Sequence, residues 1–186
     1  MRKKILVKGP ALSRSGYGEQ TRFALRALRT REDLYDVYVM NIPWGHTGHI
    51  SVGDERNWID QQIIKTMGYI QQTGGNPNFD QSLQVTIPNE FEKIAAEDIG
   101  YTAGIETTKV SAEWIDKCNS VVSRVLVVSN HSKKVFENTT YTVKDQNGAD
   151  VPGWGMQVPV VAINYPVIDV PTESIEIDYT TSNNFL

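Results

Sequence analysis

The chain has 186 residues, of which 40% are hydrophobic, and this is enough for one packed domain but not for two domains of ordinary size. Its formal net charge is −4 and its basic residues form no long run, so nucleic-acid binding through neutralised phosphates is disfavoured. The chain has a single cysteine, Cys118, and no apolar run long enough for a secretory signal or a membrane span. These features predict a cytoplasmic protein and leave peripheral membrane contact open.

The first forty residues alternate between strand and helix signals. An apolar run at 5–8 ends at Gly9-Pro10, a polar loop with two glycines covers 11–18, and helical periodicity spans 19–30. A second strand at 35–42 completes a right-handed βαβ unit. We expect one face of the helix to point inward and its arginines to point away: Phe23, Ala24, Ala27 and Leu28 inward, Arg22, Arg26 and Arg29 outward.

The rest of the chain continues this alternation. Helices are predicted at 58–72, with Ile59, Ile63, Met67 and Ile70 on the inner stripe, at 111–120 with Ser111 as N-cap, and at 131–138. Strands are predicted at 83–87, 100–105, 121–128 and 158–164. A short helical turn is expected at 91–97 and a hairpin at 145–155 around Asn147-Gly148.

Strands that alternate with helices predict an α/β fold: a single Rossmann-like, doubly wound parallel sheet with helices on both faces. We assign residues 1–170 to this domain and 171–186 to an extended connection, because the chain from Tyr165 onward carries Pro166, Pro171 and alternating acids. The last residues, Asn184, Phe185 and Leu186, look like the start of another strand, although a frayed terminus would look the same.

Small and polar residues follow successive predicted strands. In open α/β sheets ligands bind beyond the carboxyl ends of the strands, so these residues are expected to line one site, although turns favour the same residue types. They are Ser13 to Gly18, Ile42 to His49, Pro88 to Glu90, Glu106 to Thr108, and Ser129 to Ser132.

The first of these loops sets Gly16 and Gly18 at the start of a helix, where backbone N–H groups and the positive helix end favour an anion. It is not a dinucleotide fingerprint, because its glycines are spaced differently from GxGxxG and no acid ends the second strand. No Gly-Lys-Ser/Thr sequence follows it, so it is not a Walker A loop either. Nicotinamide binding is therefore disfavoured.

Two carboxylates, Glu90 and Glu106, follow predicted strands directly. Each could orient or deprotonate an acceptor hydroxyl, and each could equally be an acid that stabilises a helix N-terminus. Trp44 could offer an aromatic face to a sugar ring or simply pack half-buried. His46 and His49 lack the further ligands that a zinc site needs, so no metal site is expected.

Several of these segments together resemble the N-terminal domain of GT-B glycosyltransferases, nearest to the group 1, family 4 kind. The resemblance covers most of residues 5–170 and is carried by three stretches: Gly9-Pro10 through Ser15-Gly16-Tyr17-Gly18, Gly100 to Thr107, and Val128 to Phe136. Family members commonly carry a histidine or an acid after the middle strands. At the matching place this chain has Pro88-Asn89-Glu90, so no residue here corresponds to the family's histidine.

The resemblance implies that residues 1–170 form the acceptor-side half of a two-domain enzyme and that 171–186 are a linker and the start of a missing C-terminal, donor-binding domain. It implies transfer of a sugar from a nucleotide-sugar donor to a hydroxyl of a carbohydrate or other acceptor, without a metal or bound cofactor. Glu90 and Glu106 would be the catalytic residues. Donor and acceptor would meet Ser15, Gly16, Tyr17, Gly18, Trp44, Pro88, Asn89, Thr107, Ser129 and His131.

Two alternatives stay open on the residues. A methyltransferase of Rossmann type would need an acid after the second strand, and that acid is missing. A non-catalytic carbohydrate-binding or interaction domain with a degenerate glycosyltransferase fold would need none of the donor contacts. Because those contacts would come mostly from the missing domain, we expect residues 1–186 alone to transfer little or no sugar.

Overall fold

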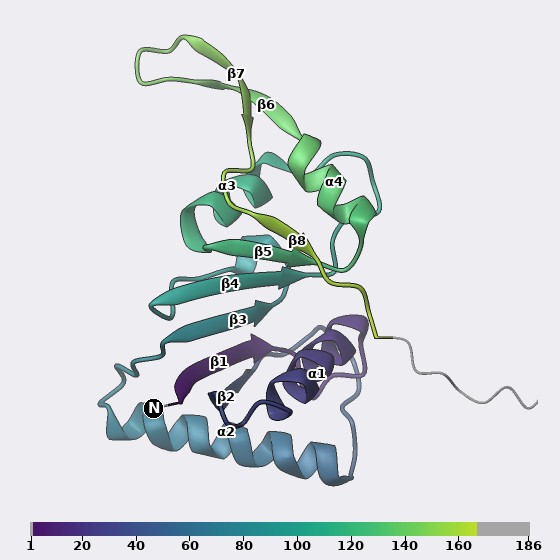
Figure 1. Cartoon of the computed structure of the whole chain (residues 1–186), viewed down its shortest axis with the longest axis vertical. Helices are drawn as coiled ribbons and strands as arrows, with labels where there is room; N and C mark the ends of the chain where they lie inside the picture. Colours follow the sequence, from purple (N-terminus) through teal and green to yellow (C-terminus); the bar gives the residue numbers. More distant parts are fainter. Residues whose placement is uncertain (1, 167–186) are drawn as a thin grey trace, which may run out of the picture.

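The computed structural model describes residues 2–166 and has the predicted α/β fold (Figure 1). The strands of the main sheet are β1 (Lys3–Gly9), β2 (Tyr35–Asn41), β3 (Gln81–Val85), β4 (Glu97–Thr102), β5 (Arg124–Val127) and β8 (Val160–Ala162). The helical elements are α1 (Gly16–Arg29), α2 (Asp54–Gln72), the 3-10 turn η1 (Pro88–Glu90), α3 (Ala112–Val121) and α4 (Asn130–Asn138). A hairpin of β6 (Thr140–Lys144) and β7 (Asp150–Gly155) projects from the body; its turn lies in the segment predicted at 145–155, but its first strand precedes that segment.

The main sheet has the order β2-β1-β3-β4-β5-β8, and every neighbouring pair is parallel. The chain moves from β1 outward to β2, returns past β1 to β3, and then continues in the opposite direction. The order therefore reverses between β1 and β3, which is where open α/β sheets bind ligands. This confirms the Rossmann-like prediction and makes the carboxyl ends of β1 and β3 the first place to look for a site.

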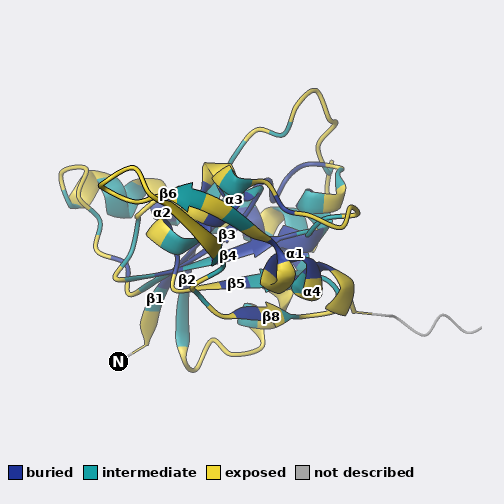
Figure 2. Cartoon of the chain, turned by 90° about the horizontal axis from the view of Figure 1, so that it is seen from above, coloured by how far each residue is buried: buried dark blue, intermediate teal, exposed yellow. Residues whose placement is uncertain are grey.

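Helices pack on both faces of the sheet, and the buried residues gather on its central strands (Figure 2). On one face Leu25 of α1 packs with Val7 and Val39. On the other face α3 and α4 bury Cys118 and Phe136 against β5. Within residues 2–166 no helix is long and apolar enough to cross a membrane.

The edge strand β2 is closed by α2. Thr66 Oγ1 accepts a hydrogen bond from the backbone N–H of Val39 at 2.8 Å, and Lys65 Nζ donates to the carbonyl of Val37 at 2.7 Å. These two side chains occupy backbone groups that an unprotected edge would offer to another strand. The sheet is therefore sealed on this side.

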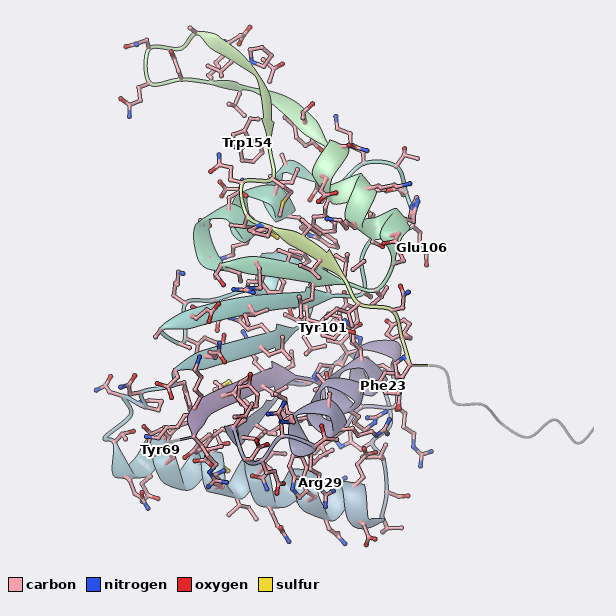
Figure 3. All side chains as sticks on the ribbon, in the orientation of Figure 1. Phe23, Arg29, Tyr69, Tyr101, Glu106 and Trp154 are labelled. Carbon is pink, nitrogen blue, oxygen red and sulfur yellow. The ribbon has the colours of Figure 1, made fainter. Side chains whose placement is uncertain are left out.

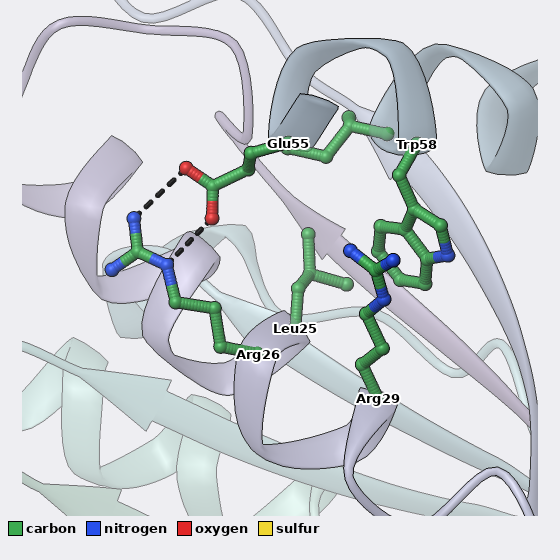
Figure 4. A pocket seen from close by; sticks show the side chains of 6 residues that line it. Leu25, Arg26, Arg29, Glu55 and Trp58 are labelled. Carbon is green, nitrogen blue, oxygen red and sulfur yellow. Dashed lines mark hydrogen bonds and ion pairs between the residues drawn. The ribbon is translucent and has the colours of Figure 1, made fainter. Parts of the chain in front are cut away.

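The helices α1 and α2 also meet through charged and aromatic side chains (Figure 4). The Arg26 guanidinium donates two hydrogen bonds to the Glu55 carboxylate, the second at 2.8 Å, and the Arg29 guanidinium lies 5.2 Å from the centre of the Trp58 ring. The gap between them has a volume of about 20 Å³, enough for a water molecule but not for a ligand.

The predicted orientation of α1 was wrong in part. Arg22 is buried, with 5% of its surface exposed, and its Nη1 donates to the carbonyls of Ala11 and Ser13 at 2.8 and 2.9 Å. Of the predicted inner residues, Ala24 and Leu28 do pack against the core, but together with Phe23 and the exposed Ala27 they also line an open groove. A guanidinium that caps loop carbonyls is compatible with burial, and the 3.6-residue periodicity cannot reveal such a partner.

The region before β4 also departs from the prediction. Residues 91–97 form no helical turn, because buried side chains of the sheet take up their backbone groups. Gln84 accepts from the Glu92 N–H at 2.9 Å and donates to the Glu92 carbonyl at 2.6 Å, while the Asp98 carboxylate accepts from Ala95 N–H at 3.1 Å. As a result β4 begins at Glu97, three residues before the predicted strand at 100–105.

Other boundaries shift less. The helix predicted at 19–30 begins at Gly16, so the two glycines of the first loop belong to its first turn. Val121 ends α3 instead of starting β5, and Met67 on α2 is 66% exposed and not part of an inner stripe. Ser111 is the N-cap of α3 as predicted, with its Oγ accepting from Trp114 N–H. The domain boundary at 170 and the connection at 171–186 lie outside the described residues.

The Asp98 cluster yields a stability prediction. Asp98 is 1% exposed and accepts from Ser82 Oγ at 2.6 Å as well as from the 94–95 backbone. Asp98→Ala leaves these buried donors without an acceptor, so we expect a loss of about 3 kcal/mol in the free energy of unfolding. Denaturant unfolding measures this, and Asp33→Ala, at an exposed ion pair, is the matched control. Equal effects of the two substitutions would contradict the role given to the cluster.

Candidate functional site

The start of α1 is built by hydroxyl groups. Ser15 is the N-cap, with its Oγ accepting from the Gly18 N–H at 3.0 Å. Ser13 Oγ donates to Ser15 Oγ at 2.9 Å and lies 2.6 Å from Thr47 Oγ1 in the loop after β2. This chain of hydroxyls joins the loop after β1 to the loop after β2, so both loops form one unit at the carboxyl edge of the sheet.

The two glycines of this turn serve different purposes. A Cβ on Gly18 would lie 2.0 Å from the Ser13 carbonyl oxygen, so only glycine allows the loop to return this closely to the helix. Nothing lies within 4 Å of the place where a Cβ on Gly16 would sit, and Gly16 is exposed. The first turn of α1 therefore faces open space at Gly16, and the N–H groups of a first helical turn together with the positive helix end favour an anion.

Tyr17 holds α1 to the neighbouring strand ends. Its hydroxyl lies 2.9 Å from Thr102 Oγ1 at the end of β4 and accepts from the Ala103 N–H at 3.2 Å. Its ring lies 4.6 Å, centre to centre, from that of Trp44, which is half-buried. Burial raises the pKa of the Tyr17 phenol, and the negative charge of Glu90 raises it further. Tyr17 is thus an uncharged link between α1, β4 and the Trp44 loop.

Glu90 lies across the strand reversal from this helix. Thr86 Oγ1 donates to Glu90 Oε2, and Lys8 Nζ donates to the Glu90 carbonyl at 3.1 Å and to Glu92 Oε2 at 2.9 Å. Lys8 belongs to β1 and Thr86 directly follows β3, so both strands that flank the reversal position this turn. Pro88 is buried and shapes the turn, whereas Asn89 and Glu90 are exposed.

The loop after β4 approaches the start of α4. Gly104 has φ of +96°, and a Cβ there would lie 2.2 Å from Ser132 Oγ, so glycine is needed on both counts. His131 Nε2 lies 3.3 Å from the Thr107 carbonyl oxygen. Ser129 is the N-cap of α4, accepting from Ser132 N–H at 3.0 Å. Glu106 is exposed on this loop, beside α4 (Figure 3).

The predicted site residues thus fall into two groups. Ser15, Tyr17, Trp44 and Glu90 gather at the reversal between β1 and β3, with Tyr17 close enough to Glu90 to sense its charge. The second group, around the start of α4, contains Glu106, Thr107, Ser129 and His131. Glu90 belongs to the first group and Glu106 to the second. Among the described residues, no hydrogen bond or ion pair links these two carboxylates.

Sequence reasoning missed two residues that position the first group, Lys8 and Thr86, whereas Ser13 lies in a loop that it did identify. Lys8 could have been identified from the sequence, because it is a charged residue within an otherwise apolar strand. Thr86 could not have been identified, because a single hydroxyl residue at a strand end is common in any turn.

Cys118 and the histidines add no further chemistry. Burial raises the pKa of the Cys118 thiol to about 12, which leaves the thiolate nucleophile unpopulated near neutral pH. His46 and His49 are exposed on the loop after β2. Among residues 2–166 no group of three His, Cys, Asp or Glu side chains is placed to hold a metal ion.

Comparison with known proteins places the chain in no family: no protein-family model matches it, and neither does a curated protein or a solved structure.

The glycine turn yields a paired prediction. Gly18→Ala forces a methyl group against the Ser13 carbonyl, so we expect it to lower the free energy of unfolding by about 2 kcal/mol or more. Gly16→Ala adds a methyl group in open space on a helix and is expected to be neutral or slightly stabilising. Thermal and denaturant unfolding of both variants measure the difference. If Gly16→Ala were the more destabilising change, the geometry of this turn would be wrong.

Proposed function

We propose that this chain is the acceptor-side half of a GT-B-type glycosyltransferase, which moves a sugar from a nucleotide-sugar donor to a hydroxyl of a carbohydrate or other acceptor. One observation carries the proposal. The open, positive end of α1 at Gly16 and the Thr86-bound carboxylate of Glu90 lie on the two sides of the strand reversal. An anion site and a carboxylate at one switch point are what transfer from a sugar diphosphate to a hydroxyl needs.

The end of α1 would act on the leaving group. When the bond between the sugar and the diphosphate breaks, negative charge builds up on the diphosphate oxygen. Backbone N–H groups at Gly16 and the helix dipole would stabilise that charge, and the hydroxyl chain from Ser13 to Ser15 keeps the turn rigid. A rigid donor group loses little free energy to reorganisation during the reaction.

Glu90 would act on the acceptor. Thr86 occupies one carboxylate oxygen, which leaves the other to accept the proton of the acceptor hydroxyl as its oxygen attacks the sugar carbon. Tyr17 stays protonated beside it, because burial raises its pKa, and so does not compete as a base. Asn89 and, on the next loop, Glu106 and Thr107 are exposed and suited to bind further acceptor hydroxyls.

In this proposal donor binding also needs a second domain that completes the cleft. Residues 1–186 alone are therefore expected to bind saccharide while transferring little or no sugar.

A non-catalytic carbohydrate-binding domain is the second candidate. The hydroxyls of Ser13, Ser15 and Ser129 favour this candidate. Each makes an internal hydrogen bond that holds a loop in place, so none is available to take part in a reaction. The exposed rim at Asn89, Glu106 and Thr107 would bind sugar hydroxyls without any proton transfer. Sugar transfer by the natural protein separates this candidate from the first.

The proposal predicts a graded loss of transfer in the natural protein that carries this domain. Glu90→Gln removes the base, and we expect kcat to fall at least about 100-fold with little change in saccharide affinity. Thr86→Val leaves the carboxylate misplaced, and we expect a loss of roughly tenfold. Turnover of a panel of nucleotide sugars measures both, and Glu113→Gln, an exposed acid at the start of α3, is the matched control.

Two outcomes would contradict parts of this account. Saccharide binding without transfer in the natural protein would leave only the carbohydrate-binding candidate. Transfer that is unaffected by Glu90→Gln would remove the role proposed for that carboxylate.

A further inference from the structure

The face of the main sheet that carries α1 is only partly covered by described elements: Leu83 and Tyr101 are 9% and 6% exposed, but the surface beside the helix is open. Beside α1 lies a groove with a volume of about 610 Å³. Phe23 and Ala27 of α1 form one wall, Leu83, Tyr101 and Leu126 of the sheet form the floor, and Ile163 forms the far rim. Phe23 and Tyr101, both labelled in Figure 3, line this groove from the helix and from the sheet.

The two faces of the same strands differ sharply. On the face under α3 and α4, Val125, Val127 and Val160 are at most 4% exposed. On the groove face the alternate residues Val161 and Ile163 are 43% and 44% exposed. Parallel sheets are covered on both faces in stable proteins, so this apolar face calls for a covering segment.

We propose that the groove is a docking site for residues 167–179 of this same chain. The described chain already leads into it. Ile163 and Pro166 line the groove, the Tyr165 ring lies 6.1 Å from the Phe23 ring, and the Tyr165 hydroxyl donates to Gln20 Oε1 at 3.1 Å. The next residue therefore starts at the mouth of the groove, with no linker to span.

The sequence of this segment suits the groove. Ile175, Ile177 and Tyr179 alternate with Glu176 and Asp178, so an extended chain would present an apolar face to the sheet and acids to solvent. A segment with this pattern covers an apolar floor without burying a charge.

A buried amide beneath the groove ties the end of the described chain to α1. Gln20 is fully buried, and its Nε2 is the one buried side-chain nitrogen or oxygen among residues 2–166 that has no hydrogen-bond partner. Gln20 lies one helical turn before Phe23 and Ala24, which line the groove, and it bonds Tyr165 at the mouth.

The length and the tether favour this occupant over a second copy of the chain. Crossing from β8 over β5 and β4 to β3 takes three strand spacings, about 14 Å, whereas thirteen extended residues reach about 43 Å. A segment joined directly to the rim has an effective concentration in the millimolar range, which a separate molecule at ordinary dilution cannot match. None of these arguments depends on the proposed glycosyl transfer.

The test uses the full chain with a nitroxide spin label at Ser182→Cys. Cys118 is buried with its pKa raised to about 12, so it resists labelling. We expect the label to broaden the methyl resonances of Leu83, Leu126 and Ile163, and to spare Val151 on the projecting hairpin. Ile175→Asp with Ile177→Asp should abolish the broadening, whereas the matched control Glu176→Gln with Asp178→Asn should retain it.

Three outcomes would overturn the proposal. The groove methyls of the native sequence could stay sharp, or the Ile175→Asp, Ile177→Asp variant could broaden them as strongly as the native sequence does. Broadening could instead occur only between spin-labelled and isotope-labelled molecules in a mixture, which would identify a second copy as the occupant.

Discussion

The close approach of α1 to the end of β1 is the constraint on which the rest of the molecule depends. A Cβ on Gly9 would lie 2.6 Å from Thr21 Oγ1, and one on Gly18 would lie 2.0 Å from the Ser13 carbonyl, so helix and loop meet at distances that only glycine allows. The buried Arg22 guanidinium then binds the Ala11 and Ser13 carbonyls and holds the loop. With the helix start placed in this way, Tyr17 reaches β4 and Gly16 faces open space beside the strand reversal.

Rigidity at the carboxyl edge contrasts with exposure along the groove face. Around Glu90, strands β1 and β3 each contribute a side chain, Lys8 and Thr86, so the turn is anchored from both sides of the reversal. The face of the sheet at β8 is less well covered, because Val161 of this strand and Ile163 just after it are nearly half exposed. The carboxyl edge at Glu90 is thus held by side chains of two strands, whereas the sheet face beside α1 is partly open.

The sequence predicted the parts of this structure that follow from local patterns. Alternating strand and helix signals identified the α/β sheet, and a serine before an apolar run identified the cap at Ser111. It failed where a distant partner decides the outcome. The burial of Arg22 depends on loop carbonyls, and the shape of residues 91–97 depends on Gln84 and Asp98 in the sheet. In the site, Glu90 was predicted from its place after a strand, but its partner Thr86 became visible only in three dimensions.

The central claim is that saccharide binds at the carboxyl edge, between the start of α1 and the Glu90 turn. The most direct measurement is a titration of the isotope-labelled chain with a panel of oligosaccharides, following the backbone amide resonances by NMR. The account predicts shifts that cluster at Gly16, Asn89 and Glu106, with none at the opposite strand ends around Lys4 and Asp80. Shifts that cluster around Lys4 and Asp80, or none with any saccharide, would contradict it.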